Sequence, residues 1–197
     1  NTGDQIRLFL SDETFSKFSQ QEQTARAVTD LDIIYEDTDI LLINKPAGML
    51  SQPDDTKEPS MVEYLIGYLL QNGSLTEENL RTFHPSVCNR LDKNTSGVIA
   101  AGKSLAGLQE LSTLFHDRTV HKDYLCIVKG KLTRSRHIRG YLHKDANLNK
   151  VSVSPTKEKD AQPIETQYTP ICNNEHATLL KVRLITGRTH QIRAHLA

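Results

Sequence analysis

Residues 60–73 carry the clearest hydrophobic pattern of the chain, with apolar side chains recurring at three- and four-residue spacing. This spacing is typical of one buried face of a helix. Ser60 followed by Glu63 matches a capping box, which begins helices, and Gly73 is a common residue just past a helix end. The pattern therefore predicts an amphipathic helix between these residues, with a buried face formed by Val62, Leu65, Ile66, Leu69 and Leu70.

Short apolar runs bounded by turn-forming residues predict several strands. Residues 33–35 and 40–43 are separated by an acidic tetrapeptide and are expected to form a β-hairpin. The second of these strands should end within residues 44–48, because Pro46 has no N–H to donate and Gly48 permits a turn. Further strands are expected at 98–101, 124–128 and 179–185, and in the last of them Leu180, Val182 and Leu184 face one way while Lys181 and Arg183 face the other.

A second helix is expected after Ser104, a preferred N-cap residue. Residues 131–160 hold many charges and few large apolar groups, which favours an exposed hairpin or arm. Helices and hairpins are interleaved irregularly, so the pattern predicts an α+β fold with a mixed, mostly antiparallel sheet rather than regular βαβ winding. The buried stripe of the second helix would consist of Leu105, Leu108, Leu111 and Phe115.

The composition excludes several classes of protein. Of 197 residues, 37% are hydrophobic and 24% charged, which is typical of a globular domain and excludes a disordered or fibrous chain. No run approaches the roughly 18 apolar residues of a membrane helix, so no membrane partner is expected. Cys88, Cys126 and Cys172 form no C-x-x-C pair, which argues against a disulfide scaffold and for a reducing, cytoplasmic compartment. Because the chain begins with Asn1, we interpret it as part of a longer protein.

The net charge of zero hides two unlike halves. Residues 1–80 carry 5 Lys and Arg against 15 Asp and Glu, a net charge of −10, whereas residues 81–197 carry 19 against 9, a net charge of +10. A basic half of this size is what a phosphate-rich partner such as a nucleic acid requires. A solvated surface on a two-sided protein explains the same numbers equally well.

The polar run at residues 89–97 is the densest group of candidate functional residues. It lies among turn formers before an expected strand, where a scaffold presents side chains to a cleft. Asp92 in this loop could act as a nucleophile or a general base. The alternative is that Asp92 only orders the loop, by bonding the backbone N–H groups of Asn94 and Thr95.

A second candidate run spans residues 186–195. Thr189 could cap a helix that begins there, which would place Arg188 at a positively polarised helix end suited to an anion. The alternative is a surface helix with scattered charge. His190 and His195 are five residues apart and do not share a helix face, and acidic or Cys ligands are absent at a recognisable spacing, so no metal site is expected.

Three runs in order resemble the motifs of the RluA-type pseudouridine synthase family. They are Asn44-Lys45-Pro46-x-Gly48, then residues 90–97 (RLDKNTSG), then residues 186–193 (TGRTHQIR). The resemblance covers about residues 33–197. Two features depart from the family pattern, which usually has His where this chain has Asn89 and which continues past the third motif. The opening residues Thr2-Gly3-Asp4-Gln5-Ile6-Arg7-Leu8 resemble the last strand of an S4-type RNA-binding domain.

The resemblance implies an enzyme that isomerises uridine to pseudouridine in RNA on a bent sheet flanked by helices, with no cofactor and no metal. It assigns Asp92 as the catalytic aspartate and Arg193 as the arginine that pairs with it and keeps it ionised. Tyr124 matches the tyrosine that packs on the target base and is the candidate base for the C2′ proton. Arg90 matches the arginine that fills the space left by the extruded uridine. Further RNA contacts are expected from Lys122, Arg188, His190 and Gln191.

These expectations define the domains and partners. Residues 1–30 would be the end of the S4-like domain and a linker, and residues 31–197 a pseudouridine synthase catalytic domain that lacks its C-terminal part. The expected partner is RNA, with ribosomal RNA favoured and transfer RNA as the alternative, and the protein is expected to be a monomer. Two rivals stay open, a non-catalytic RNA-binding module and a small-molecule hydrolase that uses Asp92 with His190 or His195.

Overall fold

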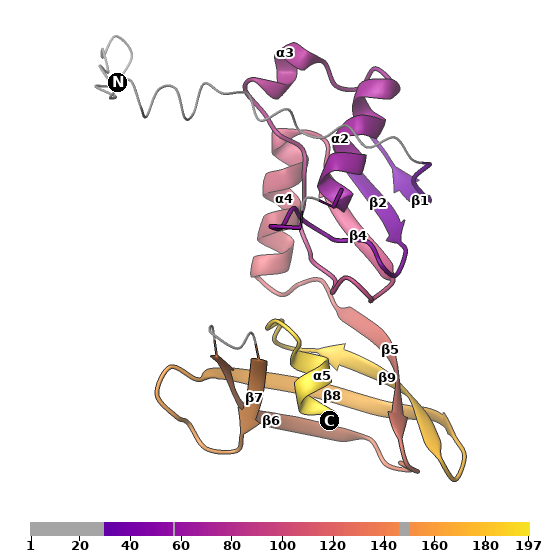
Figure 1. Ribbon diagram of the computed structural model, residues 1–197, viewed down its shortest axis with the longest axis vertical. Helices are drawn as coiled ribbons and strands as arrows, with labels where there is room; N and C mark the ends of the chain where they lie inside the picture. The colour runs from indigo at the N-terminus through magenta and orange to yellow at the C-terminus, as the bar shows by residue number, and fades with distance from the viewer. Residues whose placement is uncertain (1–29, 57, 146–149) are drawn as a thin grey trace. The chain divides into compact units, whose positions relative to one another are not determined.

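The computed structural model describes residues 30–56, 58–145 and 150–197. They fold into two compact units, of which the first ends at Leu111 and the second begins at Ser112 (Figure 1). Each unit has its own antiparallel sheet, and the predicted α+β class is confirmed. The expected strands belong to two sheets rather than one. The S4-like stretch predicted at the start of the chain lies outside the described residues.

The first unit is built on a four-stranded sheet that contains the predicted hairpin. Antiparallel pairing joins its two strands, with Glu36 opposite Leu41. The Asp37 carboxylate closes the turn by accepting the N–H groups of Asp39 and Ile40, each at 2.8 Å. In spatial order the strands are β1 (Ile33–Glu36), β2 (Ile40–Lys45), β4 (Gly97–Gly102) and β3 (Ser86–Val87).

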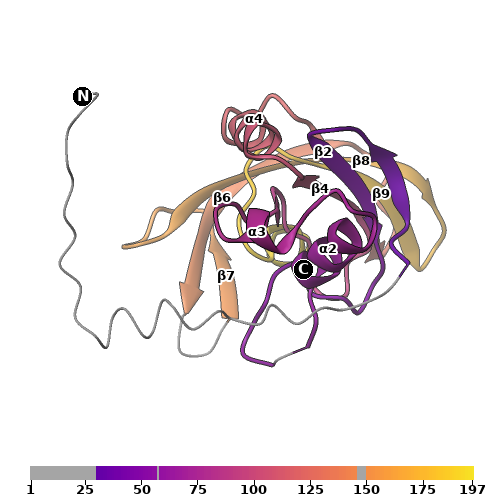
Figure 2. The same ribbon diagram turned by 90° about the horizontal axis from the view of Figure 1, so that it is seen from above.

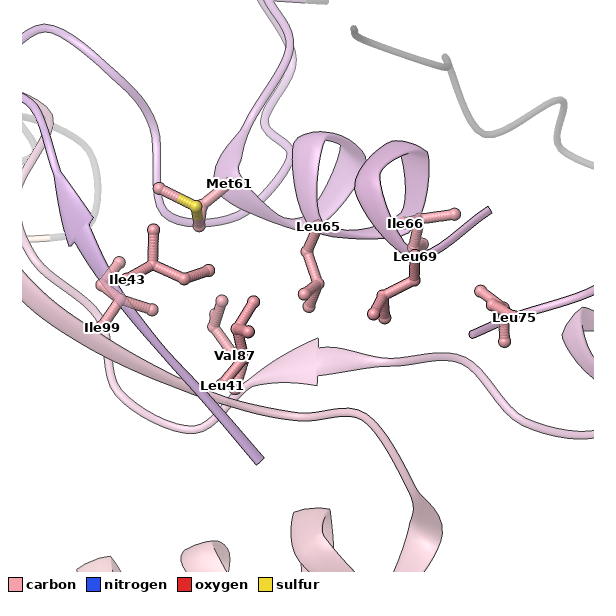
Figure 3. Packing of buried hydrophobic residues seen from close by; sticks show 10 residues of the cluster. Leu41, Ile43, Met61, Leu65, Ile66, Leu69, Leu75, Val87 and Ile99 are labelled. Carbon is pink, nitrogen blue, oxygen red and sulfur yellow. The ribbon is translucent and has the colours of Figure 1, made fainter. Parts of the chain in front are cut away.

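Helix α2 (Met61–Gln71) confirms the predicted capping box. The Ser60 N–H donates to the Glu63 carboxylate at 2.7 Å, and the Ser60 hydroxyl accepts from the helix backbone. The apolar face of α2 packs on β2 and β4, because those strands direct alternate side chains toward it (Figure 3). A short helix, α3 (Glu77–Leu80), follows. The fully buried centre of this core is formed by Leu41, Ile43, Met61, Leu65 and Ile99.

Helix α4 (Leu105–His116) lies on the other side of this sheet from α2 (Figure 2). The Ser104 hydroxyl accepts the N–H of Gly107 at 3.0 Å, so the predicted cap is confirmed. A Cβ at Gly107 would lie 2.2 Å from the Asp39 carbonyl oxygen, and glycine therefore allows the helix to approach the β1–β2 turn. Leu105 is 57% exposed, so the predicted buried stripe was wrong at this first position.

The second unit is a five-stranded antiparallel sheet. The predicted arm within residues 131–160 is a hairpin of β6 and β7, but β6 also pairs with β8 and so belongs to the sheet. Tyr168, Leu180 and Val182 form the core on one face. In spatial order the strands are β5 (Lys122–Lys129), β9 (Ala177–Leu184), β8 (Gln162–Asn173), β6 (Arg136–Asp145) and β7 (Lys150–Ser154).

The short helix α5 (Gln191–His195) covers that core (Figure 1). Ile192 and Leu196 pack against the buried residues of the sheet from this segment. On β9 the predicted alternation is confirmed, because Leu180 and Val182 are fully buried while Lys181 is exposed. The third motif run is thereby attached to the face of the sheet that carries the core.

Candidate functional site

The loop that carries Asp92 connects β3 to β4 in the first unit. Asn89 ties the start of this loop to β4, since its side-chain amide donates to the Val98 carbonyl at 3.0 Å and its oxygen accepts the Ala100 N–H at 2.8 Å. Arg90 is exposed and Asp92 is half-buried. The Asp92 carbonyl accepts the Thr95 N–H at 2.9 Å, so the backbone closes this turn.

A second loop, residues 45–51, holds the backbone on both sides of Asp92. The Ser51 hydroxyl donates to the Leu91 carbonyl at 2.7 Å and accepts the Leu91 N–H at 3.0 Å. On the other side, the Lys93 carbonyl accepts the Gly48 N–H at 2.8 Å and the Lys45 ammonium at 3.1 Å. The first and second motif runs therefore meet in one structure around the candidate catalytic aspartate.

Lys45 is a buried cation whose charge interacts with that of Asp92. Its side chain is fully buried, and its ammonium also donates to the carbonyls of Pro46 at 2.9 Å and Met49 at 2.8 Å. An ammonium has three protons to donate, and these three carbonyls accept them all. Burial lowers the pKa of Lys45, and the negative charge of Asp92 opposes that shift. A buried positive charge is thus kept within the electrostatic range of Asp92.

The third motif run is organised by Gln191, which is only 2% exposed. Its side-chain oxygen accepts the Thr186 hydroxyl at 2.9 Å and the Arg188 N–H at 3.0 Å. Its side-chain nitrogen donates to the Glu165 carbonyl at 3.0 Å and the Thr166 hydroxyl at 2.9 Å. Two of these bonds fasten the 186–191 turn to strand β8 and the other two lie within the turn, so the whole amide is used inside the protein.

The helix expected to be capped by Thr189 begins later and is capped by a different residue. Helix α5 begins at Gln191, and its N-cap is His190, whose φ of 56° lies in the left-handed region and whose side chain makes no capping bond. The capping prediction for Thr189 was therefore wrong, and five residues do not make a helix end that binds an anion. Arg188 and Arg193 are exposed on either side of this turn.

Two further candidates lie on β5. Tyr124 is half-buried against the core that α5 also covers. Lys122 lies beside the third motif run, since its Nζ is 3.1 Å from where a Cβ would stand on Gly187. Burial lowers the pKa of Lys122, and the neighbouring Arg118 charge lowers it further. The second unit therefore brings Lys122, Tyr124 and the 186–193 run to one region.

His195 was the other candidate partner of a hydrolytic aspartate. Its Nδ1 lies 3.0 Å from the Thr166 hydroxyl, and burial lowers its pKa. It therefore shares the hydrogen-bond network of Gln191. A cavity of about 310 Å³ lies over the paired strands β6 and β8 beside this network, lined among others by Arg139, Glu165 and Thr186.

The described residues also bear on metal and membrane binding. Within residues 30–56, 58–145 and 150–197, no three His, Cys, Asp or Glu side chains are grouped as a metal ion would require. None of the helices in that part of the chain has the length and apolar character of a membrane span. The three cysteines are all free thiols.

Residues 39–197 match the family model described as RNA pseudouridylate synthase. The chain belongs to the RNA pseudouridylate synthase family. The match contains all three motif runs, so the family predicted from those runs is confirmed.

Individual members of this family show how far the similarity extends. The chain is 33% identical to the ribosomal large subunit pseudouridine synthase D of Borreliella burgdorferi, over 96% of this chain and 59% of that protein. It is 33% identical to an uncharacterized RNA pseudouridine synthase of Mycoplasma pneumoniae, the MG370 homolog, over 85% of this chain and 52% of that protein. The chain thus spans between about half and three-fifths of the length of these relatives.

A solved structure shows that the fold is shared as well. Human RNA Pseudouridylate Synthase Domain Containing 4 superposes with a TM-score of 0.63 over 83% of this chain and 62% of that chain, at 22% sequence identity.

The three motif runs could be recognised from the sequence. Ser51 and Thr166 could not, because a lone hydroxyl residue in a loop or strand carries no local signal of the distant backbone that it bonds.

Proposed function

We propose that the protein isomerises uridine to pseudouridine in RNA. The observation that carries this proposal is the family match over residues 39–197, which includes the Asp92 loop and the 186–193 run. In this reaction the N1–C1′ bond of uridine breaks, a C5–C1′ bond forms, C5 gives up its proton and N1 gains one. Substrate and product contain the same atoms, so the reaction needs no redox cofactor.

Asp92 is the proposed catalytic residue. Its carboxylate would act either at the sugar C1′ or through a glycal intermediate formed by loss of the C2′ proton. In both routes it has to be ionised and held in one place. The support for this role is local, because the backbone of both neighbours of Asp92 is hydrogen-bonded to the 45–51 loop.

Tyr124 and Arg193 are proposed to complete the chemistry. Tyr124 would pack on the target base and, in the glycal route, accept the C2′ proton. Its half-buried position against a strand core favours a fixed orientation of the ring. Arg193 would pair with Asp92 and place a positive charge beside the carboxylate.

The proposed RNA contacts come from exposed or half-buried cationic side chains. Arg90 would enter the space vacated by the extruded uridine, and Lys122 and Arg188 would bind phosphates. His190, at the left-handed N-cap of α5, is proposed to contact RNA as well. Gln191 is better assigned as a positioning residue, since its amide is consumed by four bonds to the protein. The net charge of +10 on residues 81–197 supports this interface.

Ribosomal RNA of the large subunit is the proposed substrate, and the support is the name of the Borreliella burgdorferi relative. The free cysteines fit the proposed reducing, cytoplasmic compartment, where the protein would act as a monomer.

The test is to map pseudouridines in total RNA from cells that lack the gene and from cells complemented with it. If pseudouridines in large-subunit ribosomal RNA are lost and then restored by complementation, the assignment is supported. If only pseudouridines in transfer RNA are lost and restored, transfer RNA is the substrate instead. An unchanged map would refute the activity.

A further inference from the structure

Ser51 lies 40 residues before Leu91 in the chain, yet its hydroxyl makes both a donated and an accepted bond with the backbone of that residue. We propose that Ser51 is a positioning residue for the Asp92 carboxylate, and that it acts together with Lys45 as a two-sided clamp on the aspartate loop. This inference rests on the proposed function and adds to it how the carboxylate is held for the reaction.

The Ser51 side of the clamp restricts the residue that precedes Asp92. The hydroxyl is 2.7 Å from the Leu91 carbonyl and 3.0 Å from the Leu91 nitrogen, so it binds both polar groups of one residue. Ser51 itself is only 5% exposed, and Leu91 packs against the core of the first unit. Water has little access to this position, so removal of the Ser51 hydroxyl would leave the carbonyl and the N–H of Leu91 without an equivalent partner.

The Lys45 side restricts the residue that follows. Its ammonium and the Gly48 N–H both donate to the Lys93 carbonyl. Lys45 is fully buried and its other two protons are bound by Pro46 and Met49, so the ammonium is anchored in the loop that it spans. The positive charge of the Lys45 ammonium also attracts the negative charge of Asp92, which favours the same position of the carboxylate. Two fixed points, one on each side, determine where the intervening side chain leaves the backbone.

The simpler explanation is that these bonds only stabilise the first unit. Ser104 provides a matched control, because it is also a serine of the first unit whose hydroxyl accepts a backbone N–H, that of Gly107 at 3.0 Å. That bond caps helix α4, whereas those of Ser51 go to the loop that carries Asp92. If the role of Ser51 were stability alone, Ser51→Ala and Ser104→Ala would affect catalysis alike.

The experiment compares Ser51→Ala and Ser104→Ala with the wild type in the full-length protein. Tritium release from RNA labelled at C5 of uridine gives the single-turnover rate constant and the KM, and hydrogen exchange gives the protection of the Leu91 amide. Ser51→Ala is expected to lower the rate constant by about 10- to 100-fold with KM nearly unchanged, because the carboxylate is misplaced rather than the RNA released. It should also speed exchange at Leu91, whereas Ser104→Ala should change neither quantity.

Each part of the result has its own meaning. Unchanged exchange at Leu91 in Ser51→Ala would overturn the clamp, and faster exchange with an unchanged rate constant would overturn its catalytic role. Equal rate losses in both variants would also overturn that role, in favour of stability alone. A wild-type protein that releases no tritium would refute the proposed function and the positioning role with it, while the Leu91 exchange would still decide whether Ser51 holds the loop.

Discussion

The side-chain oxygen of Gln191 accepts a hydrogen bond from the backbone N–H of Arg188 at 3.0 Å. The same oxygen accepts the Thr186 hydroxyl, so one atom joins the first and third residues of the TGR segment. The opposite end of the amide is bound to strand β8. The turn that presents Arg188 is therefore shaped from inside by a buried polar side chain rather than by a helix cap.

Replacing Gln191 with Ala should destabilise the protein. The change removes the four hydrogen bonds of a side chain that is only 2% exposed and leaves the Arg188 N–H without its partner, so the expected loss of unfolding free energy is about 2–3 kcal/mol. Urea unfolding measures it. Gln167→Ala, on the exposed face of the same β8 strand, should stay within about 0.5 kcal/mol of wild type. A Gln191→Ala protein of unchanged stability that loses only RNA affinity would restore the original assignment of Gln191 as an RNA contact.

The pairing proposed for Arg193 predicts a loss of activity. Arg193→Met removes the cation that is proposed to lie beside the Asp92 carboxylate, so the rate of tritium release from RNA labelled at C5 of uridine should fall by about 10- to 100-fold.

Arg183→Met serves as the control for this loss of activity. The Arg183 guanidinium is bound to the Asp123 carboxylate at 2.9 and 3.2 Å and has no part in the proposed chemistry. Its removal should leave the rate of tritium release at the wild-type level. An Arg193→Met protein that also releases tritium at that rate would contradict the pairing with Asp92.

Asp123 should contribute to stability in a defined pH window. Its hydrogen bonds with Arg183, and then those with Lys181, hold its pKa at about 2, below its ordinary value of 3.8. A depressed pKa stabilises the folded state above the unfolded pKa, and this contribution is lost as the pH falls from about 4 toward 2. Because Asp123 is partly exposed, the contribution is on the order of 1 kcal/mol after solvent screening. Urea unfolding between pH 2.5 and 6 should therefore show that the free energy of unfolding falls less with decreasing pH in Asp123→Asn than in the wild type. The same dependence on pH in both proteins would contradict this prediction.

Features written in a few neighbouring residues could be predicted from the sequence. The Ser60–Glu63 capping box and the Ser104 cap need only local chemistry, and both are confirmed. The alternation on β9 is confirmed for the same reason, since a period of two residues reports the buried face directly. The three motif runs also identified the family, because each is continuous in sequence.

What depends on distant residues could not be predicted. The cap expected at Thr189 is absent because Gln191 bonds Thr166, 25 residues away, and fixes a left-handed turn at His190 in its place. The Ser51–Leu91 bonds span 40 residues and leave no local pattern. Leu105 follows the helical period of its neighbours but is exposed, because the period does not say at which residue the contact of a helix with its neighbours begins.

The most direct test of the account is the Asp92→Asn variant, assayed for tritium release from RNA labelled at C5 of uridine and for RNA binding. Asn keeps the size of the side chain and removes its charge, so release should fall by at least about 1,000-fold while RNA affinity stays at the wild-type level. An Asp92→Asn protein that releases tritium at the wild-type rate would contradict the central claim that this carboxylate carries the reaction.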